Sequence, residues 1–324
     1  MQPFPGERQR GLGNSGRRFP NFIAGKLGIT RGIAAGVAAM LVLLLVGSTA
    51  LAQGPKKSQI LRSNPDQLLK SNNDLKNIEL CNGVDRSSPE PQIRGCTLLI
   101  DSGDLTKNAL AIAYNNRGDA YSAKGDFDLA LQDYDQSIKE NPTYVKAFSN
   151  RGAVHLKKGE YDKALEYFNE AIKLDPKYAP AFANRAEIYR KKNDFSQATR
   201  DYDEALRLKP DFKAVWNARC WTRAILGELQ TALADCDKAL QFEPNDATAF
   251  DSRGFVYLKM GQFDSAIDDY SSALRFKPML ASALYGRGLA KRKKGDSSGA
   301  DADIAAAKTI QAKIDDEFSR YGVR

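Results

Sequence analysis

Histidine is almost absent from this 324-residue sequence, which contains only His155, and cysteine occurs four times. The sequence has no Ser/His or Cys/His constellation for nucleophilic catalysis and no zinc-ligand spacing. It also lacks a glycine-rich phosphate loop after a strand. These absences argue against the hydrolase, zinc and nucleotide-binding classes that depend on such residues. We therefore expect no metal and no cofactor.

The sequence after residue 52 also lacks a large excess of basic over acidic residues. The chain has 48 basic and 40 acidic residues, a net charge of +8. Residues 1–52 hold six basic residues and one acidic residue, so the remainder has 42 basic and 39 acidic residues, or +3. Nucleic-acid-binding domains concentrate basic charge on one face. The near balance argues against a nucleic-acid partner.

The N-terminus has the features of an export signal. Its basic residues precede an apolar run over residues 32–51, and Ala50 and Ala52 satisfy the small-residue rule for cleavage after Ala52. We expect a signal peptide over residues 1–52. An uncleaved membrane anchor is the alternative, because the apolar run approaches the roughly 20 residues that span a bilayer. Either outcome exports the rest of the chain, to the periplasm or to the periplasmic face of the inner membrane, and membrane contact is expected only through this segment.

A strict 34-residue period dominates the rest of the sequence. A bulky apolar residue, an alanine and, in all copies but the last, a proline recur at fixed distances from an arginine. Periods of about 20–50 residues indicate stacked supersecondary units, and 34 is the period of a helix-turn-helix array. The repeated arginines are Arg117, Arg151, Arg185, Arg219, Arg253 and Arg287.

These spaced sets resemble the tetratricopeptide repeat family across residues 111–314. The resemblance implies an all-α fold, a right-handed α-solenoid of stacked antiparallel helix pairs. Residues 77–110 are expected to form a degenerate capping repeat after a flexible linker over residues 53–76, and residues 315–324 to form the end of a capping helix and a frayed tail. The six expected units are 111–144, 145–178, 179–212, 213–246, 247–280 and 281–314.

Each unit is predicted to fold as two amphipathic helices joined by a tight turn, such as the one at Gly125. Residues placed symmetrically about such a turn face each other, so a missing side chain opposite a ring lets the helices approach closely. His155 takes the position of a tyrosine in other units and is expected to pack between helices. The predicted facing pairs are Gly118 with Tyr134, Gly152 with Phe168, and Gly254 with Tyr270.

Aspartate follows five of the six arginines by 16 residues, and Tyr167 replaces it after Arg151. The same symmetry places these aspartates beside the arginines on the partner helix, which predicts an internal ladder of ion pairs. An arginine-lined groove for anions is the alternative. The aspartates are Asp133, Asp201, Asp235, Asp269 and Asp303.

The four cysteines fall into two pairs, each symmetric about a turn. Cys81 and Cys96 flank a segment with turn composition, whereas Cys220 and Cys236 replace the facing glycine and aromatic residue of other units. Four cysteines permit three connectivities, and only this one stays within single hairpins. We expect two structural disulfides, formed in an oxidising compartment.

The family resemblance implies that a polypeptide partner binds along the concave face formed by the first helices. One subclass clamps a C-terminal carboxylate, but its lysine and asparagine pattern is not reproduced here. The apolar candidates are expected either to anchor a partner or, for Trp221 and Phe255, to pack between adjacent first helices. The candidate groove residues are Trp221, Phe255, Leu289, Ile225, Leu258, Asn115, Asn116, Asn150 and Asn184.

These features together predict a non-enzymatic scaffold or adaptor that binds a protein or peptide outside the cytoplasm. The alternative is an accessory or substrate-binding subunit acting on cell-envelope polymers such as peptidoglycan or another glycan. An RNA-binding cytoplasmic solenoid is a third possibility, which the export signal and the small net charge oppose. The sequence does not identify the partner.

Overall fold

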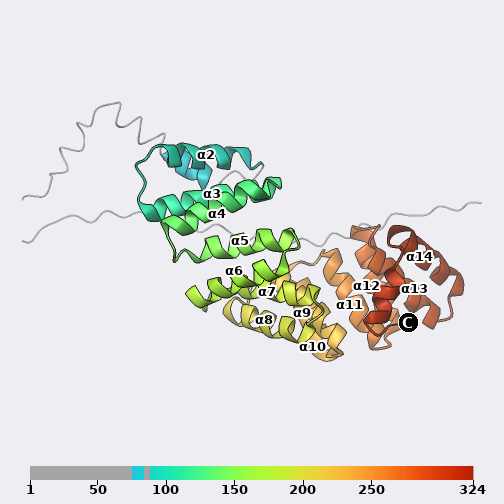
Figure 1. The fold of residues 1–324 in the computed structure, drawn as a ribbon. Helices are drawn as coiled ribbons and strands as arrows, with labels where there is room; N and C mark the ends of the chain where they lie inside the picture. Colours follow the sequence, from blue (N-terminus) through green and yellow to red (C-terminus); the bar gives the residue numbers. More distant parts are fainter. Residues whose placement is uncertain (1–74, 84–87, 324) are drawn as a thin grey trace, which may run out of the picture. The chain divides into compact units, whose positions relative to one another are not determined.

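The computed structural model describes residues 75–83 and 88–323 (Figure 1). The predicted signal peptide and nearly all of the predicted linker lie outside these residues. Helices connected by short turns make up the described part of the chain, in which no residue is assigned to a strand. None of these helices is both long and apolar enough to cross a membrane.

The helices follow one another in pairs along the chain (Figure 1). Residues 75–81 are helical and precede α2. The helices are α2 (Glu90–Asp101), α3 (Lys107–Lys124), α4 (Phe127–Glu140), α5 (Val145–Lys157), α6 (Tyr161–Leu174), α7 (Ala179–Lys191), α8 (Phe195–Leu208), α9 (Lys213–Leu226), α10 (Leu229–Phe242), α11 (Ala247–Lys259), α12 (Phe263–Phe276), α13 (Ala281–Lys293), α14 (Ser297–Ile310) and α15 (Ile314–Arg320).

Six of these pairs repeat the same packing, from α3 with α4 to α13 with α14. Each first helix contacts the second helix of its own pair and the second helix of the preceding pair. Consecutive first helices, such as α9 and α11, also touch. The fold is therefore an α-solenoid of stacked helix pairs, in which the first helices together form one surface of the array.

The turn inside each pair has a residue in the left-handed backbone region. Gly125 has a φ of 88°, and Asn193 is the only non-glycine residue with positive φ in the described ranges, at 60°. Glycine adopts this conformation without steric cost, and asparagine tolerates it. The turn residues keep the 34-residue period at Gly125, Gly159, Asn193, Gly227, Gly261 and Gly295.

The predicted contacts between glycine and aromatic residues are confirmed. A Cβ atom added at Gly152 would lie 2.9 Å from Cε1 of Phe168, and one at Gly118 would lie 2.8 Å from Cε1 of Tyr134. The third pair, Gly254 with Tyr270, is equally close at 3.0 Å. Real Cβ atoms rarely approach other atoms this closely. The two helices of each of these units therefore lie closer together than a side chain at the glycine position would allow.

The second helices end two residues before the repeat proline, as α4 does before Pro142 and α12 before Pro278. Proline disfavours a helical conformation in the residue before it, so it separates one unit from the next. The last second helix, α14, ends in the same register although Ala312 stands where the other units have proline. A proline at this position is therefore not required for the second helix to end in register.

The C-terminal segment contradicts the expected frayed tail. After α14 the chain turns and forms a separate short helix, α15, which packs against α13. Ile314 and Phe318 are each 1% exposed, and the side chain of Val323 packs on the same apolar cluster. The backbone N–H of Val323 donates to the carbonyl of Phe318 at 3.0 Å. Apolar side chains one turn apart anchor this segment to the repeats.

Candidate functional site

The repeat arginines lie against the aspartates that follow them by 16 residues. Nε and Nη2 of Arg185 donate to the two carboxylate oxygens of Asp201 at 2.7 and 2.8 Å. The same two-point contact joins Arg117 to Asp133, Arg219 to Asp235, Arg253 to Asp269 and Arg287 to Asp303, with distances of 2.7–2.9 Å. Such bidentate, charge-assisted contacts are the stronger type of ion pair.

A second arginine contact, 16 residues back along the chain, was not anticipated from the sequence. Nη1 of Arg219 donates to Asp203, and Nη1 of Arg253 donates to Asp237, at 2.8 and 2.7 Å. These acceptors belong to the second helix of the preceding unit. Each such arginine therefore links two successive units. The signal was present in the sequence, because an aspartate, asparagine or serine precedes all six arginines at this spacing, although Arg117 donates to Thr97 and not to Asp101.

Arg151, which lacks the usual aspartate, uses this backward contact and an aromatic ring. Its Nη1 lies 2.5 Å from Asp135, and its guanidinium lies 4.5 Å from the ring centroid of Tyr167. Tyr167 also stacks on His155 at 5.3 Å. His155 is 6% exposed and contacts Glu160 through Nδ1, so its predicted role in helix packing is confirmed.

The four cysteines are brought together in the two expected pairs. Cys81 lies at disulfide distance from Cys96, and Cys220 lies at disulfide distance from Cys236. Their Cα atoms are 4.5 and 5.3 Å apart, within the range that a disulfide spans. All four side chains are buried. The second pair stands where other units place glycine against an aromatic ring.

The early groove asparagines form a hydrogen-bonded chain on α3 and α5. Asn150 donates to Asn115 at 3.0 Å and to Asp119 at 2.8 Å, and Asn116 donates to Asn82 at 3.3 Å. Asn115 is only 2% exposed, so in this structure it supports the surface and is not open to a partner. Burial raises the pKa of Asp119 to about 6, against the opposing hydrogen bond from Tyr134.

Asn116, Asn150 and Asn184 occupy equivalent positions on α3, α5 and α7, and all three are half-buried. Their side chains lie on the surface that the first helices share. These side chains make this part of the first-helix surface polar.

Three of the late apolar positions are buried, and the chain's own C-terminal segment packs on one of them, Phe255, which overturns part of the groove prediction. Phe255 is fully buried, and its ring lies 4.6 Å from Trp221, 5.7 Å from Phe318 and 6.3 Å from Tyr321. The other two buried positions, Leu258 and Leu289, are 7% and 6% exposed. These three residues are thus core residues. The alternative expectation, that Trp221 and Phe255 pack together between first helices, describes the contact observed.

Two of the apolar candidates keep part of their surface. Trp221 and Ile225 are half-buried on α9 and pack at the edge of the cluster around Phe255. The indole of Trp221 meets the ring of Tyr321 edge-on at 5.5 Å. Trp221 is therefore the member of the predicted aromatic set that combines a core contact with access to a cavity.

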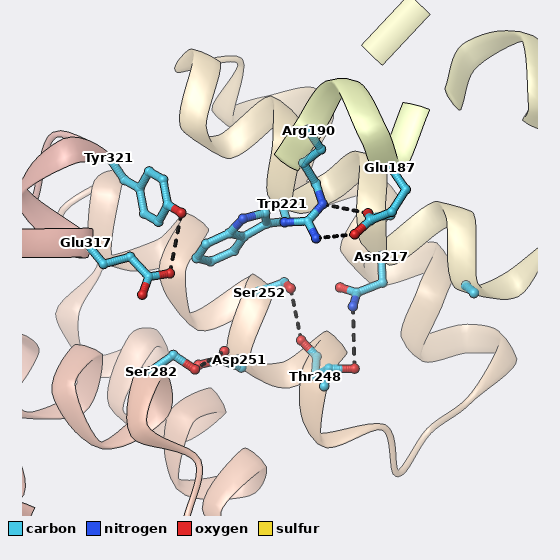
Figure 2. A pocket seen from close by; sticks show the side chains of 12 residues that line it. Glu187, Arg190, Asn217, Trp221, Thr248, Asp251, Ser252, Ser282, Glu317 and Tyr321 are labelled. Atoms are coloured by element: carbon cyan, nitrogen blue, oxygen red, sulfur yellow. Dashed lines mark hydrogen bonds and ion pairs between the residues drawn. The ribbon is translucent and has the colours of Figure 1, made fainter. Parts of the chain in front are cut away.

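That cavity lies beside the C-terminal segment, on the first helices of four successive units (Figure 2). Its volume is about 380 Å³. Its lining side chains come from α7, α9, α11 and α13, and from Glu317 and Tyr321 in the C-terminal segment. The polar and aromatic lining consists of Glu187, Arg190, Asn217, Trp221, Thr248, Asp251, Ser252, Ser282, Glu317 and Tyr321.

One acidic residue of this pocket is neutralised by a neighbour. Nε and Nη2 of Arg190 donate to Glu187 at 2.8 and 2.7 Å. Burial disfavours the charged form of Glu187, but the hydrogen bonds and charge of Arg190 outweigh it, and the pKa of Glu187 is lowered. Figure 2 shows this pair at one side of the Trp221 indole.

Asp251 is in a different environment. Burial raises its pKa to about 7, the nearby Glu317 carboxylate acts in the same direction, and the Ser282 hydroxyl, which donates at 2.6 Å, opposes both. Sequence reasoning missed this residue because its repeat position carries asparagine, serine, alanine or tyrosine in other units. Among the described residues, no group of three potential ligands is placed to hold a metal ion.

Comparison with known proteins gives matches to repeat models and to solved structures. The model named tetratricopeptide repeat matches residues 111–144, 145–178 and 179–212, and a second model, named TPR repeat, matches residues 256–295. No curated protein matches the chain.

Similar solved structures share the fold at low sequence identity. A tetratricopeptide repeat protein from Parabacteroides merdae is 17% identical, with a TM-score of 0.54, and the match covers 77% of this chain and 99% of that one. The pilF protein of Pseudomonas aeruginosa is 16% identical, with a TM-score of 0.56, and the match covers 64% of this chain and 94% of that one. The repeat period, the paired helices and these matches agree: the chain belongs to the tetratricopeptide repeat family.

Proposed function

We propose that this protein is a non-enzymatic scaffold that binds a segment of a partner polypeptide on the surface formed by its first helices. One observation carries the proposal. This surface already holds a polypeptide segment, because residues 314–323 of the chain itself lie on it with Phe318 buried. The surface therefore offers apolar contacts and backbone-binding groups of the kind that a peptide uses.

The open part of the same surface supports binding of a further segment. The pocket beside Trp221 is lined by four successive first helices, and the asparagine chain continues the polar surface on α3 and α5. An extended peptide contacts several consecutive units of a solenoid at once. The partner is therefore expected to lie across first helices, with the second helices facing away from it.

We further propose that binding takes place outside the cytoplasm. Two features support this location: the N-terminal export signal in the sequence, and two buried cysteine pairs at disulfide distance. Disulfides persist in oxidising compartments and are rare in the reducing cytosol. Intact mass measured with and without reductant, on protein recovered from the source cells, tests both the N-terminal processing and the two disulfides.

Site-specific photocrosslinking in the source cells tests partner binding. A photoreactive residue is placed at Lys146 or at Ala214, which are exposed, equivalent positions on α5 and α9. The matched control is Lys173, exposed on the second helix α6. The proposal predicts that both first-helix positions capture the same polypeptide and that Lys173 does not.

Two results would contradict the proposal. Capture from Lys173 alone would place the partner on the second helices. Retention of the purified protein on peptidoglycan or another glycan, without capture of a polypeptide from Lys146 or Ala214, would favour the accessory role in envelope-polymer metabolism.

A further inference from the structure

Two carboxylates in the pocket beside Trp221 have no cationic partner among the described residues. Asp251 accepts a hydrogen bond from the Ser282 hydroxyl at 2.6 Å. Glu317 accepts from the side-chain amide of Gln311 at 2.6 Å and from the Tyr321 hydroxyl at 3.4 Å. All of these donors are neutral. No cation among the described residues therefore balances the charge that these carboxylates carry when they are ionised.

The one arginine of the pocket does not supply that balance. Arg190 donates two hydrogen bonds to Glu187, and Lys191 lies 3.5 Å from the same carboxylate. Glu187 and Arg190 thus form a bidentate pair with no net charge. Asp251 and Glu317 remain as the carboxylates without a cationic partner among the described residues, and they reach the pocket from different helices, α11 and α15.

Aromatic rings form the wall between the two charged parts of the pocket. Figure 2 shows the indole of Trp221 between the Arg190–Glu187 pair and the Tyr321 ring. The two rings meet edge-on at 5.5 Å, which leaves the pocket lined by ring surface as well as by carboxylates. The electron-rich face of tryptophan attracts cations and also packs against the aliphatic stem of a long basic side chain.

A hydrogen-bond acceptor in the pocket also lacks a donor. Oδ1 of Asn217 is shielded from solvent and has no partner among the described residues. The Thr248 hydroxyl donates its one hydrogen to Asp246 at 2.7 Å. It can therefore only accept from Asn217, so the amide nitrogen of Asn217 is the atom that lies 3.5 Å from it. A buried acceptor without a donor costs free energy, and the negative partial charge of this oxygen adds to the acidic side of the pocket that Asn217 lines.

These groups converge on one kind of ligand. We propose that the pocket binds a lysine or arginine side chain of the partner polypeptide, with its aliphatic stem along Trp221 and Tyr321 and its charged group toward Asp251 and Glu317. This inference rests on the proposed function, because it assigns a specificity to the surface that holds the partner. A carboxylate ligand would meet two unbalanced carboxylates, and the one nearby arginine is already paired.

Peptide titration of the full chain tests the inference. The probes are the peptide Ala-Ala-Lys-Ala-Ala, blocked at both ends, and the same peptide with norleucine in place of lysine, which keeps the stem and removes the charge. The readout is the indole N–H resonance of Trp221 in protein labelled with ¹⁵N-tryptophan. Trp216, whose indole donates to the carbonyl of Pro210 at 2.8 Å, provides the internal reference.

The inference predicts a shift of the Trp221 resonance with the lysine peptide and a dissociation constant at least tenfold higher with the norleucine peptide. Asp251→Asn and Glu317→Gln are each expected to weaken lysine-peptide binding at least threefold. Asp251→Asn keeps an acceptor for Ser282, and Glu317→Gln provides an independent second variant. The control Glu170→Gln, at an exposed carboxylate on α6, should leave binding unchanged.

Equal binding of the two peptides, tighter binding of the norleucine peptide, or unchanged affinity in both carboxylate variants would overturn the inference. The crosslinking result separates this failure from failure of the proposed function. If Lys146 and Ala214 still capture one polypeptide, the surface binds a partner but the pocket does not select a basic side chain. If neither position captures a polypeptide, the proposed function fails as well.

Discussion

The ammonium group of Lys259 donates a hydrogen bond to the backbone carbonyl of Tyr321 at 3.1 Å. The same group donates to the carbonyls of Ala224 and Ile225 at 2.8 and 3.3 Å, near the C-terminal end of α9. Burial lowers the pKa of this lysine. One side chain thus joins the C-terminal segment to two first helices, and it lies over the ring of Phe255.

Lys259→Met tests this connection, because methionine keeps the apolar stem and removes the donor. We expect faster amide hydrogen exchange in residues 314–323 and a loss of about 1–2 kcal/mol in the free energy of unfolding. Lys293→Met is the matched control, since Lys293 is exposed at the equivalent position of the next unit. Equal exchange in the two variants would show that Lys259 does not hold the segment.

The raised pKa of Asp251 predicts an unusual dependence of stability on pH. The folded-state pKa is about 7, whereas an unfolded aspartate titrates near 3.9. Between these values the folded state binds more protons than the unfolded state, so the contribution of Asp251 to the free energy of unfolding falls as pH rises, by up to about 4 kcal/mol. Two other titratable groups face Asp251. The Glu317 carboxylate raises the pKa of Asp251, and burial together with the Asp251 carboxylate raises the pKa of Tyr270.

Asp251→Asn should therefore raise stability relative to the wild type at pH 8 and change it much less at pH 4. Urea unfolding at both pH values measures the difference. Equal destabilisation of the variant at the two pH values would show that ionisation of Asp251 does not destabilise the folded protein. That result would contradict a raised pKa for Asp251.

The arginine ladder predicts unequal costs for removing equivalent arginines. Arg185→Met leaves Asp201, which is 7% exposed, without its bidentate partner, and we expect a loss of about 3 kcal/mol in the free energy of unfolding. Arg151→Met leaves Asp135, whose side chain is 47% exposed, so the expected loss is about 1 kcal/mol. Thermal unfolding compares them. Unchanged stability in Arg185→Met together with lost anion binding would favour the alternative of an anion groove.

The close contact between Gly152 and Phe168 predicts a compensating pair of substitutions. Gly152→Ala adds a Cβ atom 2.9 Å from the ring, which should cost about 1–3 kcal/mol. Phe168→Leu removes ring atoms near that position, so the double variant should be less destabilised than the sum of the single variants. Chemical unfolding of the four proteins measures this coupling, and strict additivity would contradict the facing arrangement.

The sequence predicted the contacts that repeat. The facing of Gly152 and Phe168 follows from symmetry about a turn, and the ion pair of Arg185 with Asp201 follows from the same argument. Such contacts depend only on residues within one hairpin. Their spacing in the chain determines which side chains can meet.

The contacts of the C-terminal segment could not be predicted in this way. Phe318 and Tyr321 follow the last repeat, so the 34-residue register gives them no facing position. Their burial depends on how a non-repeating segment packs on first helices of several units. For this reason the sequence left open whether Phe255 anchors a partner or packs between first helices. It also gave no signature for the pocket bordered by Asp251 and Glu317.

Hydrogen–deuterium exchange of the protein bound to the captured polypeptide tests the central proposal most directly. The measurement compares amide protection in the free and bound protein along the described repeats. The proposal predicts increased protection in the first helices α5, α7, α9 and α11, with little change in the second helices α6, α8 and α10. Protection confined to the second helices would contradict binding on the first-helix surface.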